Sequence, residues 1–294
     1  MSIDEGRQEH AGATGLSVGS PWTFFAVTYA ITWACWLPAI VFDVSFNTVE
    51  GVALLVAGLA GPGLGGIGFT YLVYDDRGRA DFWQRLRSVR RIGLRWLLVI
   101  AAVPLALSLL AAGVDRLFGG VGATWAEGVV GFAANPLTIL PTLFFVTLPP
   151  FLEELGWRGY VLDRLQLRWS ALVSGVILGV AWSLWHLPLF FVADTYQSGL
   201  GVGTPEFWLF FVSVVPLSMA LSWVYNNTSR SILAAILLHS SANFSGEIVA
   251  ITPRADVYNV GLWVLFAVAI VAIWGAKTLA RADEVPKPPL PARR

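Results

Sequence analysis

The chain alternates between long apolar blocks and shorter polar segments. Eight blocks are long enough to cross a bilayer, at residues 22–42, 51–74, 94–114, 129–151, 171–192, 206–225, 231–250 and 258–276. Each is near the roughly 20 residues that an α-helix needs to span a ~30 Å hydrocarbon core. Eight such helices with hardly a polar face do not suit a soluble protein. The pattern therefore predicts an all-α, polytopic membrane protein.

Composition agrees with this prediction. The chain is 56% hydrophobic and only 13% charged, against about 25% charged residues in soluble domains, and its mean hydropathy is +0.67. The formal net charge is zero, so nothing indicates a nucleic-acid partner. The lone Cys35 excludes an intramolecular disulfide and offers no metal cluster, and we interpret it as a packing residue.

The blocks divide the chain into three segments. Residues 1–20 are polar and lack a basic stretch, so we expect no cleaved signal peptide. Residues 21–277 form the predicted membrane domain. Residues 278–294, rich in proline, lysine and arginine, are predicted to be a disordered cytoplasmic tail. Within the second block, the six glycines of residues 58–68 predict close helix packing.

Lysine and arginine fall mainly on one side of the predicted membrane. Loop 75–93 has six arginines, whereas loop 193–205 has neither lysine nor arginine, and the loops together divide 15 to 2. Because positive loops stay in the cytoplasm, loop 75–93 and both termini are predicted to be cytoplasmic. We expect a multi-pass protein of a prokaryotic plasma membrane.

Ionisable residues accompany these apolar blocks. Glu153, Glu154 and Arg158 follow the fourth block directly, and His186 and His239 lie inside the fifth and seventh. Ionisable groups are costly within a membrane, so such residues are usually functional. A single histidine could equally be a neutral hydrogen-bonding residue between helices. Two histidines and a glutamate pair favour a shared site.

Helical spacing aligns several of these residues. Residues four apart share a helix face, so Arg158 is expected to orient Glu154. His239 aligns with Asn243 in the same way. Glu153 points about 100° away from Glu154, so the two carboxylates are predicted to have different roles.

The two glutamates can lie deep in the membrane only if the fourth helix continues beyond its apolar block. A helix that ended at Phe151 would leave the glutamates at the membrane edge. The sequence Pro149-Pro150 allows a kink after which the helix restarts and runs to about residue 163. The glutamates would then lie within the membrane, in a site that opens to the cytoplasm.

Three short motifs resemble the signature of the CPBP family, the CAAX-prenyl-protease-type or Abi intramembrane metalloproteases. The family pattern is Glu-Glu-x-x-x-Arg, Phe-x-x-x-His and His-x-x-x-Asn. The matching residues here are Glu153, Glu154 and Arg158, then Trp182 and His186, then His239 and Asn243. Trp182 departs from the phenylalanine of the pattern. The resemblance covers a motif-bearing core of about residues 129–250.

The resemblance implies hydrolysis of a peptide bond in a membrane-associated or lipidated protein, within helices that surround a polar cavity. By this resemblance Glu153 would be the general base. A zinc ion held by Glu154, His186 and His239 would lower the pKa of a bound water to about 7. Asn243 would stabilise the oxyanion. A metal-free route, in which a glutamate and a histidine activate water, stays open.

Two other classes of function stay open. A proton-coupled transporter could use the same buried groups as a relay, but its two halves should resemble each other, and they share no spacing of glycine, proline or charge. Some relatives of the family are implicated in bacteriocin immunity or act as membrane scaffolds without catalysis. The intact motifs favour an enzyme.

Overall fold

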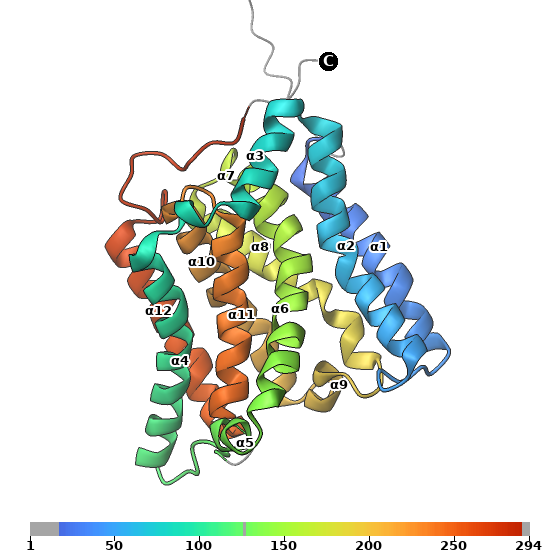
Figure 1. Ribbon diagram of the computed structural model, residues 1–294, viewed down its shortest axis with the longest axis vertical. Coiled ribbons are helices and arrows are strands. Elements are labelled where there is room, and N and C mark those ends of the chain that lie inside the picture. Colours follow the sequence, from blue (N-terminus) through green and yellow to red (C-terminus); the bar gives the residue numbers. More distant parts are fainter. Residues whose placement is uncertain (1–17, 126–127, 290–294) are drawn as a thin grey trace, which may run out of the picture.

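The chain folds into a bundle of membrane-length helices (Figure 1). The computed structural model describes residues 18–125 and 128–289. Within these residues, eight helical segments are long and apolar enough to cross a membrane, and one isolated β-bridge pairs Ala123 with Ile251. The predicted all-α membrane fold is confirmed.

The helices are bounded as follows: α1 Pro21–Val41, α2 Val49–Val73, α3 Asp76–Arg87, η1 Val89–Arg91, α4 Gly93–Leu117, α5 Val129–Ala134, η2 Pro136–Thr138, α6 Ile139–Gly156, η3 Trp157–Val161, α7 Leu162–Gln166, α8 Ala171–Trp185, η4 Leu187–Phe191, α9 Tyr196–Leu200, α10 Pro205–Asn227, α11 Ile232–Val249 and α12 Pro253–Trp274. Serine or threonine N-caps accept a backbone N–H at the start of α1, α2, α8, α10, α11 and α12. Such caps satisfy N–H groups that have no partner within the helix.

The fourth span differs from the expected 129–151. Asn135 separates the short α5 from the span, which runs over Pro136–Gln166. Pro149 and Pro150 lie inside α6 without ending it. The helix is irregular later, at the π-helical turn η3. The predicted break and restart at Pro149-Pro150 is therefore wrong, because the irregular turn lies further along, at η3. The helix does continue past residue 163, as predicted.

Loop 75–93 contains a helix that hydrophobic blocks did not predict. Asp75 caps α3 by accepting a hydrogen bond from the N–H of Gly78. The helix buries Phe82 and Arg85 and exposes other charged residues. It lies at one end of the bundle, above α11 (Figure 1).

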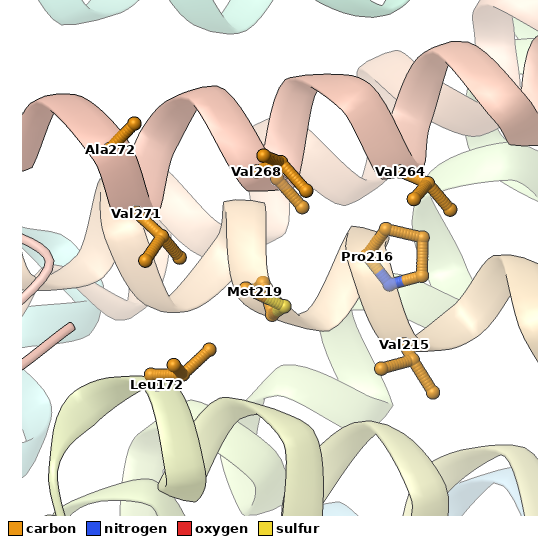
Figure 2. Close-up of a pocket in the computed structure, with 9 residues that line it drawn as sticks. Leu172, Val215, Pro216, Met219, Val264, Val268, Val271 and Ala272 are labelled. Atoms are coloured by element: carbon orange, nitrogen blue, oxygen red, sulfur yellow. The ribbon is translucent and has the colours of Figure 1, made fainter. Parts of the chain in front are cut away.

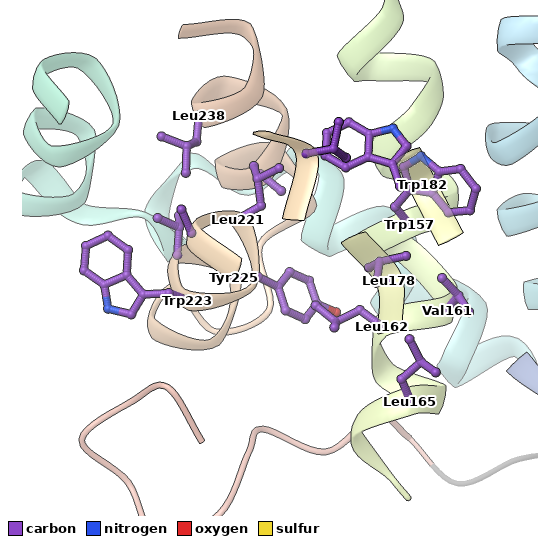
Figure 3. Close-up of a cluster of buried hydrophobic side chains, with 14 of the residues drawn as sticks. Trp157, Val161, Leu162, Leu165, Leu178, Trp182, Leu221, Trp223, Tyr225 and Leu238 are labelled. Carbon is purple, nitrogen blue, oxygen red and sulfur yellow. The ribbon is translucent and has the colours of Figure 1, made fainter. Parts of the chain in front are cut away.

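Helices α6 and α11 run side by side through the middle of the bundle (Figure 1). Helix α2 packs on the other side of α6, and α4 packs on the other side of α11. Helix α10 packs against α8 and α12. Between α10 and the η3–α7 segment the core is filled by large side chains, including Trp157, Leu162 and Tyr225 (Figure 3).

Part of the expected tail packs against the bundle. Thr278 and Leu279 are buried, and their carbonyls accept hydrogen bonds from the side chains of Asn226 and Asn227, each at 2.8 Å. Residues 290–294 of this tail, and residues 1–17 of the expected N-terminal segment, lie outside the described residues. The division into an N-terminal segment, a membrane domain and a tail stays a prediction.

Candidate active site

The charged residues of the three motifs come from three neighbouring parts of the bundle. The α6–η3 segment carries Glu153, Glu154 and Arg158, His186 directly follows α8 as its C-cap, and α11 carries His239. All five are buried. The span that holds the glutamates has 31 residues, about 46 Å at 1.5 Å per residue. The segment runs over Pro136–Gln166, so the glutamates lie inside it rather than at its end.

The Glu154 carboxylate is held between two motif residues. Nη1 of Arg158 donates to both carboxylate oxygens at 3.1 Å, as the four-residue spacing predicted. Nδ1 of His239 lies 3.1 Å from Oε1 of Glu154. Both Glu154 and Arg158 are fully buried, where an unpaired charge would be costly. Arg158 thus neutralises Glu154, and Glu154 orients His239.

Arg158 is itself fixed by α10. Its Nη2 donates to the backbone carbonyl of Ser218 at 3.1 Å and to the Ser218 hydroxyl at 3.0 Å. That hydroxyl donates to the carbonyl of Gly175 in α8. Ser218 could not be predicted from the sequence, because a serine in an apolar helix is common and its partners come from distant segments.

Glu153 has different partners from Glu154. Its Oε2 accepts a hydrogen bond from Nε1 of Trp182 at 2.7 Å. Among the described residues no arginine, lysine or histidine forms an ion pair with Glu153. The two adjacent carboxylates are thus separated in role, since one is paired with a cation and the other accepts from a neutral donor.

Besides Glu153, Trp182 also contacts Arg158, His186 and His239. Its ring lies under the guanidinium of Arg158, 5.3 Å from ring centroid to Cζ, and meets the ring of His239 edge-on at 4.9 Å. Its carbonyl lies 2.9 Å from Nδ1 of His186. A carbonyl can only accept, so Nδ1 of His186 donates and Nε2 is left free for a ligand. The tryptophan that departs from the family pattern therefore adds a donor to the site.

His186 and Asn243 lie at the margin of this group. The His186 ring packs against Trp185 and Phe210. Asn243 donates from Nδ2 to the carbonyl of Val146 at 3.3 Å, which leaves its second N–H available. The structure therefore brings Glu154, Arg158 and His239 into direct contact, joins Glu153 and His186 to them through Trp182, and places Asn243 between α11 and α6.

Glycines bring α2 against α6 beside the glutamates. A Cβ built on Gly66 would lie 2.2 Å from the carbonyl oxygen of Leu155, and one on Gly156 would lie 2.2 Å from that of Pro62. Real Cβ atoms do not approach backbone oxygens so closely. The predicted close packing of the glycine-rich block is confirmed, and it fixes the segment that carries Glu153 and Glu154.

The predicted zinc site is not assembled in this arrangement. Among the described residues, no three His, Cys, Asp or Glu side chains group closely enough to hold a metal ion. The Glu154 oxygens are already engaged by Arg158 and His239. The set Glu154, His186 and His239 does not fit a zinc ion as these side chains lie, and the metal stays a prediction.

An apolar groove of about 450 Å³ lies elsewhere, between α8, α10 and α12 (Figure 2). Leu172, Met219 and Val268 are among its lining residues. None of the motif residues lines it. The groove offers hydrocarbon contacts but no polar chemistry.

Comparison with known proteins identifies relatives of the chain. The family model described as type II CAAX prenyl endopeptidase Rce1-like matches residues 135–245, a range that contains every motif residue. The chain is also 31% identical over 261 residues to a protein of Methanococcus maripaludis named CAAX prenyl protease 2. That alignment covers 86% of this chain and 93% of the relative.

Proposed function

The chain belongs to the Rce1-like family of type II CAAX prenyl endopeptidases and is an intramembrane protease, and we propose that Glu153 activates the water that cleaves its substrate. The observation that supports this assignment is that the two carboxylates have different partners. Glu154 is neutralised by Arg158, whereas Glu153 accepts from the neutral Trp182. A carboxylate without a cationic partner accepts a proton more readily than a paired one.

The proposed hydrolysis uses four side chains of the site. Glu153 takes a proton from water while Nε2 of His186 accepts a hydrogen bond from the second O–H and so orients the water. The water oxygen adds to the carbonyl carbon of the scissile bond. His239, whose Nδ1 faces Glu154, and Asn243 stabilise the oxyanion. Glu153 then passes its proton to the leaving amine as the C–N bond breaks.

A zinc ion is the second proposed route. It would supply a water of lowered pKa if Glu154, His186 and His239 regrouped around it. The free Nε2 of His186 is compatible with such a role, but the contacts of Glu154 with Arg158 and His239 would first have to break.

We propose that the substrate is a membrane-associated protein that carries a prenylated C-terminus. The name of the Methanococcus relative specifies a CAAX prenyl substrate, and CAAX sequences are prenylated on their cysteine. A buried site inside a bilayer suits a substrate that a lipid holds at the membrane. We also propose that α3 lies on the cytoplasmic side of a prokaryotic plasma membrane, because the arginines concentrate there.

Peptide cleavage by purified protein in liposomes tests the substrate. Two peptides of one sequence, with and without a farnesyl group on the cysteine, would be incubated with the protein, and the products would be identified by mass spectrometry. We expect cleavage of the farnesylated peptide only. Equal cleavage of both peptides would contradict the prenyl requirement while leaving the protease assignment intact.

A further inference from the structure

A second group of buried charges lies outside the proposed chemistry. It joins Asp81 and Arg85 of α3, Asp163 of α7, Tyr225 of α10, and Arg230 in the turn between α10 and α11. Arg85, Asp163 and Arg230 are at most 6% exposed. The two aspartates balance the two arginines in charge. The cluster therefore connects an amphipathic helix with the ends of three elements that carry or support the site.

Arg85 is the member that reaches furthest toward the site. Its Nε lies 2.9 Å from Oδ2 of Asp81. Its Nη1 donates to the hydroxyl of Tyr225 at 2.7 Å, and its Nη2 donates to the carbonyl of Gly159 at 2.9 Å. The planar guanidinium thus makes two hydrogen bonds in different directions beside an ion pair with Asp81, which the single ammonium of lysine cannot reproduce.

The other members hold Arg85 in place. The Tyr225 hydroxyl donates to Oδ1 of Asp163 at 2.9 Å, and Arg230 pairs with Asp163 and with Asp81. Burial alone lowers the pKa of Arg230, but Asp163, Tyr225 and Asp81 together outweigh burial and raise that pKa above its usual value. Both arginines are thus anchored by carboxylates on two different helices.

Gly159 belongs to the π-helical turn that follows the glutamates. This turn also carries Arg158, the partner of Glu154. A Cβ on Gly159 would lie 2.9 Å from the ring of Phe82 in α3. Helix α3 therefore contacts the turn twice, through the Arg85 hydrogen bond and through Phe82. π-helical turns inside α-helices are rare and occur often at functional sites.

We propose that Arg85 is a positioning residue for catalysis. By binding the Gly159 carbonyl it holds the π-helical turn, and through the turn it sets the position of Arg158 and hence of Glu154 and His239. Arg85 itself touches none of the reacting groups. This inference rests on the proposed function, since it needs Glu154 and His239 to act in the reaction.

The variant Arg85→Lys tests the proposal. It keeps the positive charge between Asp81 and Asp163 but loses the bond to Gly159. We expect kcat on the farnesylated peptide to fall by about 10- to 100-fold, the range that a displacement of about 1 Å produces, with KM changed by less than about twofold. Hydrogen exchange of the backbone amides of residues 157–162 should quicken, while α1 and α12 exchange as before.

Arg91→Gln is the matched control. Arg91, in η1 just after α3, donates to the carbonyl of Ser229 and lies 3.8 Å from Asp81. It therefore fastens this segment to the turn between α10 and α11 and makes no hydrogen bond to the π-helical turn in the described residues. We expect this variant to keep its kcat even if its melting temperature falls. A variant Gly159→Ala, which pushes Phe82 away, should reproduce the kcat loss of Arg85→Lys if the lysine variant proves too unstable to purify.

Three outcomes would distinguish failure of the positioning role of Arg85 from failure of the proposed function. Wild-type kcat and unchanged exchange at residues 157–162 in Arg85→Lys would overturn the positioning role. Equal loss of kcat in Arg91→Gln would also overturn it, because the effect would then be general anchoring of α3. If Glu153→Gln stayed active in the same assay, the proposed function itself would fail.

Discussion

The indole Nε1 of Trp182 donates a hydrogen bond to Oε2 of Glu153 at 2.7 Å, from one helix of the bundle to another. The same ring packs against the Arg158 guanidinium and the His239 ring. Trp182 therefore orients the proposed base and fills the space between the other charged side chains. These two contributions can be separated by mutation.

Replacing Trp182 with phenylalanine should lower kcat while leaving the site packed. Trp182→Phe keeps an aromatic ring, and also the backbone carbonyl bound by His186, but removes the N–H that holds Glu153. A hydrogen bond to a charged group contributes about 1.5–3 kcal/mol, so we expect kcat to fall by about 10-fold or more. Steady-state kinetics on the farnesylated peptide would measure this.

Trp223→Phe is the control for this prediction. Trp223 is also a buried tryptophan, but its Nε1 has no hydrogen-bond partner among the residues that the structure describes. We expect its kcat to match that of the wild type. Equal kinetics in both variants would show that the Trp182 hydrogen bond does not position the base.

The sequence predicted the spans and the local pairs well because both depend on neighbouring residues. Apolar blocks report membrane helices directly, and the pairing of Glu154 with Arg158 follows from helical spacing. The hydrogen bond from Trp182 to Glu153 depends on how α8 is rotated against α6. The residue pattern of a single helix does not reveal how that helix is rotated against its neighbour.

Helix α3 and the π-helical turn were missed for different reasons. The α3 sequence, DRGRADFWQRLR, is dominated by charge, and its few apolar residues do not form a span. Its burial of Arg85 depends on acceptors in α7, α10 and η3. No particular residue composition marks a π-helical turn, so this one could not be predicted. Pro149-Pro150 instead indicated a helix break at a position where the helix continues.

Adding one methyl group between α2 and α6 should impair both stability and activity. In Gly66→Ala the new Cβ would meet the carbonyl oxygen of Leu155, so one helix must shift. Overpacking of this kind costs about 1–3 kcal/mol. We expect a melting temperature lower by several degrees, and slower peptide cleavage because α6 carries the glutamates. Thermal unfolding in detergent and the peptide assay would measure both.

Gly68→Ala provides the comparison within the same helix. A Cβ there meets nothing within 4 Å, and both variants gain the same helix propensity of about 1 kcal/mol. Gly68→Ala should therefore be as active as the wild type and at least as stable. If the two variants behaved alike, close packing at Gly66 would not support the site.

Metal removal separates the two proposed routes of water activation. With Glu154 engaged by Arg158 and His239, the arrangement predicts that exhaustive chelation leaves the cleavage rate unchanged. Purified protein would be assayed before and after chelation, with its metal content measured by mass spectrometry. Activity that disappears with the metal and returns with zinc would establish the zinc route and require the three predicted ligands to regroup.

Cysteine labelling tests the proposed orientation. In a Cys35→Ser background, Arg90→Cys would place a thiol beside α3, and Val202→Cys would place one in the loop before α10; both positions are exposed. We expect a membrane-impermeant maleimide to label Val202→Cys in intact cells and to label Arg90→Cys only after permeabilisation. The reverse pattern would mean that α3 lies outside.

The most direct test of the account is the cleavage of a farnesylated peptide by Glu153→Gln in liposomes. Glutamine keeps an oxygen that can accept from Trp182 but cannot take a proton from water. Loss of a general base typically costs about 100-fold or more in rate, so we predict at least that loss of kcat, while Glu50→Gln, at an exposed position in α2, cleaves like the wild type. Cleavage by Glu153→Gln at the wild-type rate would contradict the assignment of Glu153 as the base.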